Sequence, residues 1–192
     1  MEYTDKIYEA INLVCNLHIH QTRKGNNTPY VSHCFSVAWI LSNYTNNEDV
    51  IVAGLLHDVL EDVPEYTKEQ ITDQFGINVA NLVSNVSEPK TDDNGKSLPW
   101  ELRKQIYFKQ LETGSNDALL ISIADKIHNI KSIINSYHTN GNGIWQYFKS
   151  TKEQQLNRYQ QILDYAKTKL NSSIVEDFEK IFNEFSKIAQ YD

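Results

Sequence analysis

The stretch from Val50 to Asp62, VIVAGLLHDVLED, restricts the possible fold more than any other part of the chain. It predicts a helix that is apolar on every side along most of its length, and such a helix belongs in the middle of a fold. The helix ends in two polar pairs at helical spacing, His57 with Glu61 and Asp58 with Asp62. Because buried charges need partners, this cluster favours a bound cation. A solvated helix end is the alternative interpretation.

The remainder of the chain predicts further helices and contains no convincing strand or internal repeat. Apolar residues at helical spacing predict an amphipathic helix over residues 5–21, and a second strongly apolar helix should begin at Asn116. Polar, turn-forming residues predict loops at 23–29 and 88–96, and the second loop could cover or line a pocket. We therefore predict an all-α, single-domain fold that covers residues 1–192.

The chain is acidic, with a formal net charge of −7 and a pI near 5.4. This balance argues against nucleic acid as the main partner, although a small anionic ligand is possible where a few cations gather. The sequence has no apolar run long enough to span a membrane and no signal peptide, so we expect a cytoplasmic protein with no membrane partner. Its two cysteines are too few for a disulfide framework, and we expect reduced thiols.

Four side chains on apolar faces of three predicted helices could bind one metal ion: His33, His57, Asp58 and Asp125. A lone histidine is usually a core or surface residue and a lone aspartate a helix cap. The adjacent pair His57–Asp58, and an aspartate inside the apolar run ISIADKIHNI, are less ordinary. Two imidazoles and two carboxylates suit Mn²⁺, Fe²⁺ or Mg²⁺ in an octahedral site better than a closed tetrahedral zinc site.

The sequence resembles the HD-domain metal phosphohydrolases, and among them the hydrolase domains of the RelA/SpoT type and the small stand-alone alarmone hydrolases. The resemblance covers Leu17 to about Ile134. It rests on segments that follow one another in order: His18 and Gln21, Arg23-Lys24, Pro29-Tyr30 with His33, AGLLHDVLED from Ala53, Phe75-Gly76 with VANLV, and ADKIHNI from Ala124. The segment KSLPWELRK, from Lys96 to Lys104, is closer to the stand-alone hydrolases than to the long bifunctional enzymes.

The resemblance implies the central roles in the site. The residues at the metal-ligand positions of the family are His33, His57, Asp58 and Asp125. Glu61 and Asp62 fall where the family has its acid–base pair. A divalent ion, expected to be Mn²⁺ with other divalent cations possible, would lower the pKa of a bound water, while Glu61 or Asp62 would take and return protons.

The resemblance also implies which side chains contact the substrate. Arg23 and Lys24 lie on the substrate-contact loop of the family, and Asn129 lies at the position that helps to place the substrate sugar. Tyr159 is the candidate counterpart of a tyrosine that touches phosphate in the stand-alone enzymes, although a helical tyrosine is more often a packing residue. Ser122 stands where the family often has a lysine, and this difference could remove a substrate contact.

Local cations must supply the affinity for an anionic substrate, because the net charge of the whole chain repels it. Arg23 and Lys24 precede the helix of His33 by a single loop. Three more cations flank the predicted loop at 88–96 and could close over the phosphates: Lys96, Arg103 and Lys104. Ordinary surface cations are the alternative interpretation of this second group.

We therefore expect a Mn²⁺-dependent hydrolase that removes the 3′-pyrophosphate from guanosine tetra- or pentaphosphate (ppGpp or pppGpp) and yields GDP or GTP. One alternative is hydrolysis of another nucleotide, such as removal of the 2′-phosphate of NADPH. A second is a metal-stabilised helical module that binds a nucleotide as a sensor, but Glu61 and Asp62 argue against it, since a pure binding protein has little use for a second acidic pair. The HD class that acts on deoxynucleoside monophosphates fits Arg23-Lys24 and KSLPWELRK less well.

Overall fold

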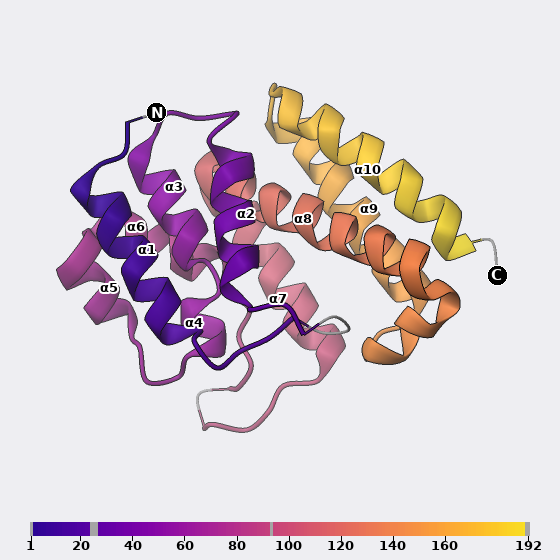
Figure 1. Ribbon diagram of the computed structural model, residues 1–192, viewed down its shortest axis with the longest axis horizontal. Coiled ribbons are helices and arrows are strands. Elements are labelled where there is room, and N and C mark those ends of the chain that lie inside the picture. The colour runs from indigo at the N-terminus through magenta and orange to yellow at the C-terminus, as the bar shows by residue number, and fades with distance from the viewer. Residues whose placement is uncertain (1, 24–26, 93, 191–192) are drawn as a thin grey trace.

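Helices make up the regular structure of this protein (Figure 1). The computed structural model describes residues 2–23, 27–92 and 94–190. Within these ranges the elements are, in order, α1 (Asp5–Leu17), α2 (Val31–Leu41), α3 (Glu48–Leu56), α4 (Val59–Asp62), α5 (Lys68–Phe75), α6 (Ile77–Val86), α7 (Trp100–Thr113), α8 (Asn116–Asn140), the 3₁₀ helix η1 (Gly141–Tyr147), α9 (Lys152–Lys169) and α10 (Ser173–Gln190). The described residues form no strand beyond two isolated bridges, so the predicted all-α, single-domain fold is confirmed.

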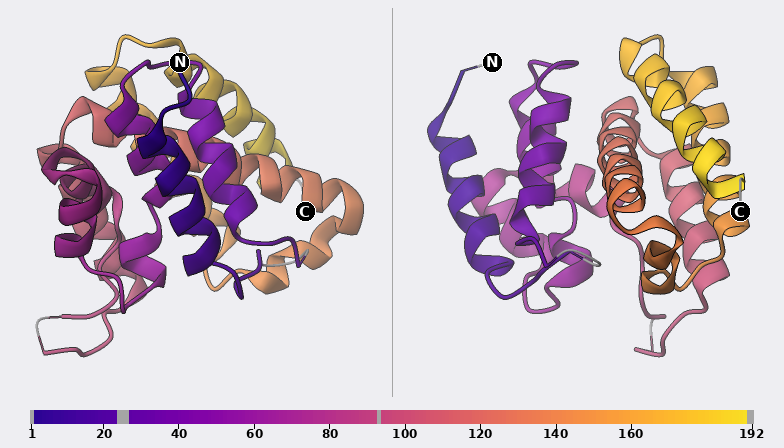
Figure 2. Two further views of the ribbon diagram at one scale, coloured as in Figure 1. Left: turned by 60° about the vertical axis from the view of Figure 1, so that its left-hand side comes forward. Right: turned by 45° about the vertical axis from the view of Figure 1, so that its right-hand side comes forward.

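Two apolar helices, α3 and α8, form the centre of the core. Every residue of α3 from Val50 to Leu56 is buried, as the apolar run predicted, and α3 packs against α1, α2, α6 and α8. In α8 the buried residues are continuous from Ala118 to Ile127. Figure 2 shows α8 between the amino-terminal helices α1 to α3 and the carboxy-terminal pair α9 and α10. The polar residues of α3 and α8 are therefore held by packing on several sides.

The helix predicted to run without a break to Asp62 is interrupted. α3 ends at Leu56, and α4 begins at Val59 with Asp58 as its N-cap residue. Nδ1 of His57 lies 2.9 Å from the carbonyl oxygen of Gly54, so a side chain occupies a carbonyl that belongs to the helix ladder. The prediction of one continuous helix is therefore wrong, although the Asp62 N–H still donates to the Asp58 carbonyl at 2.8 Å.

The first helix is also shorter than predicted. α1 ends at Leu17 and the chain turns at His18, whose side chain is buried. Nδ1 of His18 lies 2.7 Å from Oε1 of Gln21. Nε2 of Gln21 then donates to the carbonyl oxygen of Asp62 at 3.1 Å. Residues 18–21 therefore leave the helix to hold the end of α4, an interaction over 41 residues of sequence that no local pattern contains.

Gly54 allows α2 and α3 to pack closely. A Cβ atom at this position would clash with Cδ1 of Leu41, a fully buried residue of α2 that has little room to move. The contact holds α2 against α3 at Gly54, whose carbonyl oxygen also faces Nδ1 of His57. No helix among the described residues is both long and apolar enough to cross a membrane.

Candidate functional site

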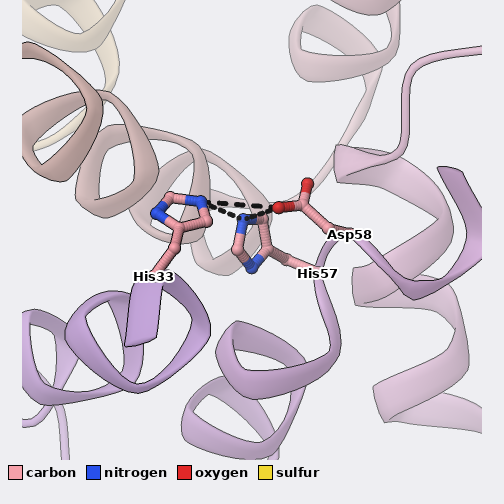
Figure 3. Close-up of side chains that lie close together, drawn as sticks. All are labelled: His33, His57 and Asp58. Atoms are coloured by element: carbon pink, nitrogen blue, oxygen red, sulfur yellow. Dashed lines mark hydrogen bonds and ion pairs between the residues drawn. The ribbon is translucent and has the colours of Figure 1, made fainter. Parts of the chain in front are cut away.

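Four side chains from three parts of the chain meet in the middle of the fold. His33 comes from α2, His57 and Asp58 from the junction of α3 and α4, and Asp125 from α8. Nε2 of His33 lies 3.2 Å from Nε2 of His57 and 3.4 Å from Oδ2 of Asp58. Nε2 of His57 lies 3.0 Å from the same oxygen (Figure 3). Oδ1 of Asp125 completes the group at 3.1 Å from His33 Nε2 and 3.7 Å from His57 Nε2.

Both imidazole rings turn Nε2 toward the carboxylates, because Nδ1 is engaged on the opposite side of each ring. The Nδ1 atom of His57 faces the backbone carbonyl of Gly54. The Nδ1 atom of His33 faces a side chain instead, Nδ1 of His128, at 2.7 Å. Oδ2 of Asp58 also accepts a hydrogen bond from the hydroxyl of Tyr30 at 2.6 Å. The orientation of each ring and of the Asp58 carboxylate is thus fixed by a defined neighbour.

The electrostatics of the cluster call for a cation. Burial opposes ionisation of Asp58, but the neighbouring charge of His57 holds the pKa of this carboxyl well below its usual range. Burial opposes ionisation of Asp125 as well, and Lys126 holds its pKa low. The carboxylates of Asp58 and Asp125 in turn raise the pKa of His57 well above normal against the effect of burial. The imidazole nitrogens of His33 and His57 and the partly buried carboxylate of Asp58 lie close enough together to bind a divalent metal ion, and the buried Asp125 carboxylate adjoins them. Such an ion would replace the proton of His57.

Glu61 and Asp62 follow the cluster on α4 and differ in their surroundings. Burial raises the pKa of Glu61 to about 7, and the charges of Asp58, Asp62 and Glu88 add to this effect. Oε2 of Glu61 accepts from the backbone N–H of Glu88 at 3.3 Å. Asp62 instead pairs with Nζ of Lys90 at 2.6 Å. Glu61 can therefore exchange a proton near neutral pH, whereas Asp62 is tied to a cation.

The cluster opens into a large cavity. A cavity of about 690 Å³ is lined by Glu61 and Asp62 and by residues of the loops and helices around them. A smaller adjoining space of about 170 Å³ reaches the cluster itself and is lined by His33, Asp58 and Asp125 together with Glu61. Among the residues predicted from sequence to contact substrate, those that line the larger cavity are Arg23, Asn129, Arg103, Lys104 and Tyr159.

Arg23 and Asn129 are linked to the cluster by hydrogen bonds. Nη2 of Arg23 donates to Oδ1 of Asn129 at 2.7 Å, and Nδ2 of Asn129 donates to Oδ1 of Asp125. The guanidinium carbon of Arg23 also lies 5.6 Å from the centre of the Tyr30 ring. Asn129 therefore connects a cation of the cavity wall to a carboxylate of the cluster. Lys24, the other predicted contact of this loop, lies outside the described residues.

The loop at 88–96 contributes a different lysine from the one that the sequence suggested. Lys96 is exposed and its backbone forms two hydrogen bonds with Asp92 in a turn. Among the described residues that line the two cavities, this loop is represented by Glu88 and Lys90 rather than by Lys96. The structure thus brings Arg103 and Lys104 to the cavity and leaves Lys96 at its outside.

Three cations of the cavity wall converge on one buried carboxylate. Oε1 of Glu88 lies 3.3 Å from Nη1 of Arg103, and Oε2 is bonded by Nζ of Lys104. Nη2 of Arg158, from α9, lies 3.8 Å from Oε2. Burial lowers the pKa of Lys104 to about 8, and the charge of Arg158 adds to this effect. We call this group the basic cluster; it consists of Glu88, Arg103, Lys104 and Arg158.

Tyr159 and Ser122 are both packed into the protein. The Tyr159 ring is only 8% exposed and meets the Phe185 ring edge-on at 5.4 Å between centroids, yet it also lines the cavity. It serves as a packing residue and as part of the wall. Ser122 is buried, and its hydroxyl lies 2.8 Å from that of Tyr107. Because Ser122 faces Tyr107 inside the core, it does not itself reach the cavity lining.

Sequence reasoning missed several residues of the site. His128 could have been found, because it lies three residues after Asp125 on a predicted helix and so shares its face. Arg158 and Glu88 carried no such signal, since a cation in a polar helix and an acid at the start of a loop are ordinary surface features. Their ion pair joins the segment after α6 to α9, and only tertiary packing brings these two segments together.

Comparison with known proteins gives consistent matches. A family model described as the HD domain matches residues 10–153. The chain is 37% identical over 130 residues to the guanosine-3′,5′-bis(diphosphate) 3′-pyrophosphohydrolase MESH1 of Xenopus tropicalis, a region that is 66% of this chain and 69% of the relative. The human protein of the same name is 34% identical over 131 residues, which cover 67% of this chain and 69% of the relative.

Solved structures match over more of the chain. One, described as that of a metazoan ortholog of SpoT that hydrolyzes ppGpp and plays a role in starvation responses, has a TM-score of 0.78 at 26% identity and covers 96% of this chain and 97% of its own. A crystal structure of a protein from Listeria monocytogenes has a TM-score of 0.67 at 34% identity and covers 83% of this chain and 97% of its own. The likeness extends over the helices on both sides of the cluster.

Proposed function

The chain belongs to the HD-domain family, and we therefore propose that it is a Mn²⁺-dependent phosphohydrolase that removes the 3′-pyrophosphate of ppGpp or pppGpp. Residues 1–192 would form one hydrolase domain. The observation that carries the proposal is that Glu61, with a pKa of about 7, lines both the small space at His33, Asp58 and Asp125 and the larger cavity that Arg23 and Lys104 also line. The substrate class comes from the relatives, of which several carry the name of this activity.

The metal site would consist of His33, His57, Asp58 and Asp125, whose donor atoms already converge. A divalent ion bound there would supply Lewis-acid activation of water and of the phosphoryl oxygens. The protein would supply the proton transfers. Glu61, with a pKa of about 7, would accept a proton from the attacking water and return one to the leaving group. Asp62, through its ion pair with Lys90, would hold the Lys90 ammonium group close to Glu61.

The cations would hold the phosphates on both sides of the cavity. Arg23 would contact one phosphate group from the side of α8, with Lys24 as a further contact of the same loop, and Asn129 would orient the sugar beside Asp125. The basic cluster would supply Arg103 and Lys104 as further phosphate contacts. Tyr159 would close the cavity wall as a phosphate contact. Lys96, which is exposed and lines neither cavity, would contact the substrate only as it approaches.

A panel of nucleotides tests the proposal directly. Purified protein loaded with Mn²⁺ is incubated with ppGpp, pppGpp, NADPH and deoxynucleoside monophosphates, and released pyrophosphate and phosphate are measured separately. We expect pyrophosphate and GDP or GTP from the guanosine substrates. The matched control is Asp58→Ala, which should release neither. If only NADPH releases phosphate, the protein is a phosphatase of NADPH and not a hydrolase of ppGpp. Tight nucleotide binding without release of phosphate or pyrophosphate would favour a sensor.

A further inference from the structure

His128 lies directly behind His33 on the side away from the other ligands. The two rings are 4.7 Å apart between centroids, and their Nδ1 atoms approach to 2.7 Å. Nε2 of His33 points in the opposite direction, toward His57, Asp58 and Asp125. His33 therefore lies between the proposed metal site and a second imidazole that is not a member of that site.

The short distance between the two Nδ1 atoms determines which ring nitrogen of each histidine carries a hydrogen. Two ring nitrogens at 2.7 Å must share one hydrogen, so one nitrogen donates and the other accepts. If His33 accepted at Nδ1, its neutral ring would carry a hydrogen on Nε2, where a metal ligand needs a lone pair. If His33 donates from Nδ1, Nε2 is free to bind. The second arrangement requires a neutral His128 with its hydrogen on Nε2 and its lone pair on Nδ1.

We propose that His128 is a positioning residue for the metal site: its Nδ1 accepts the hydrogen bond from His33 and fixes the His33 tautomer that presents Nε2 to the ion. This inference rests on the proposed function. His57 shows the same arrangement with a different acceptor, the carbonyl oxygen of Gly54. Every residue has a backbone carbonyl, but the acceptor for His33 exists only because position 128 is histidine.

The location of His128 strengthens its effect. It lies on α8 three residues after Asp125, so one face of one helix carries both a proposed ligand and the support for another ligand on α2. α8 and α2 pack directly against each other. The hydrogen bond thus fixes the ring of His33 relative to the carboxylate of Asp125, and its loss should loosen the geometry of the metal site.

The test compares two variants that differ in the acceptor. His128→Leu removes the acceptor and replaces the ring by an apolar side chain of similar size. His128→Asn places Oδ1, bonded to Cγ as Nδ1 is in histidine, where it can accept from His33. We expect Mn²⁺ to bind about 10- to 100-fold more weakly to His128→Leu, measured by calorimetry without substrate, and binding to recover largely in His128→Asn. The matched control is His138→Leu, the same substitution at an exposed position of α8, which should bind Mn²⁺ as the unaltered protein does.

A nuclear magnetic resonance measurement reads the tautomer itself and needs no variant. The ring nitrogens of the unaltered protein are recorded with Zn²⁺, which is diamagnetic and binds nitrogen ligands more tightly than Mn²⁺. We expect the hydrogen of His33 on Nδ1 and that of His128 on Nε2. A hydrogen on Nδ1 of His128, or equal Mn²⁺ affinity in His128→Leu and the unaltered protein, would overturn the inference and leave the proposed function intact. Absence of divalent metal binding by the unaltered protein would overturn the proposed function instead.

Discussion

The two charged clusters on the walls of the cavity are unbalanced in opposite directions. In the proposed metal-binding cluster, the carboxylates of Asp58 and Asp125 converge on two imidazoles, and the charge of Lys126 beside Asp125 offsets only one of these carboxylates. In the basic cluster, three cations converge on the single carboxylate of Glu88, so positive charge is in excess. A chain with a net charge of −7 has thus separated its charges locally. A metal ion in the first cluster and a polyanion at the second, as the proposed function requires, would together restore the balance of charge.

Glu61 lines the spaces beside both clusters, and its position explains its raised pKa. Burial raises its pKa most, and the charges of Asp58 in the metal-binding cluster, of Asp62 and of Glu88 in the basic cluster add to this effect. The two clusters can therefore be tested separately, because a change in the first should act on metal and turnover, and a change in the second on substrate binding.

The largest effect should come from breaking the metal-binding cluster with Asp58→Ala. The variant should lose Mn²⁺ binding, measured by calorimetry, and turnover together, because the carboxylate contacts both imidazoles of the cluster. The loss of kcat should exceed the factor of about 10²–10⁴ that one acid–base group contributes. Asp73→Ala, at an exposed position of α5, is the control and should change neither quantity. Full turnover in Asp58→Ala would remove the metal from the proposal.

Glu61→Gln should separate turnover from metal binding. The amide has the shape of the carboxyl but cannot accept the proton, so kcat should fall by about 10²–10⁴ while the Mn²⁺ affinity stays nearly unchanged. In the unaltered protein, kcat/KM should rise as pH increases through about 7, because the pKa of Glu61 is raised to that value and only the ionised form is a base. This limb of the pH profile should vanish in Glu61→Gln. A variant with nearly full turnover would make Asp62 the candidate base.

Removal of the ion should also destabilise the fold. The ion offsets the repulsion between the buried carboxylates of the native state, and an ion at 100 times its Kd contributes about 2.7 kcal/mol. EDTA should therefore lower the Tm measured by calorimetry, and Mn²⁺ should restore it. The comparison protein is Asp58→Ala, whose Tm should not respond to either reagent. An unchanged Tm in the chelated native protein would count against a structural role for the metal.

Arg23→Ala should act on substrate binding rather than on metal. Hydrogen bonds to charged groups contribute roughly 1.5–3 kcal/mol, so KM for ppGpp should rise by about tenfold or more with a smaller change in kcat. Rising salt should weaken binding more in the unaltered protein than in this variant. Lys131→Ala, an exposed cation of α8, is the control. Equal KM and equal salt dependence in Arg23→Ala would show that this side chain does not hold the phosphates.

The smallest effect should come from Lys104 in the basic cluster. Its pKa is lowered to about 8, so the charge is present below that pH and is lost as pH rises through it. KM for ppGpp should therefore increase above about pH 8 in the unaltered protein. Lys104→Ala should raise KM mildly at pH 7 and should abolish the increase at high pH. A rise in KM that persists in Lys104→Ala would assign this titration to another group.

Local patterns predicted the fold class and the core of the site. The apolar runs around Ala53 and Ala124 require buried helices, and polar residues inside such runs must meet one another or a ligand. The break between α3 and α4 could not be predicted, because it depends on the His57 ring capturing the Gly54 carbonyl. The basic cluster could not be predicted either, since Glu88 and Arg158 meet only through tertiary packing.

The sequence separation within the buried cluster has a kinetic consequence. His33 and His57 are 24 residues apart, and His33 and its neighbour His128 are 95 residues apart. Closing such loops costs chain entropy, and the group is complete only once α8, which carries His128 and Asp125, has docked on α2 and α3. A metal ion would therefore recognise a fold that is already assembled. It should slow unfolding and prolong the lifetime of the native chain, with little effect on the rate at which the chain first folds.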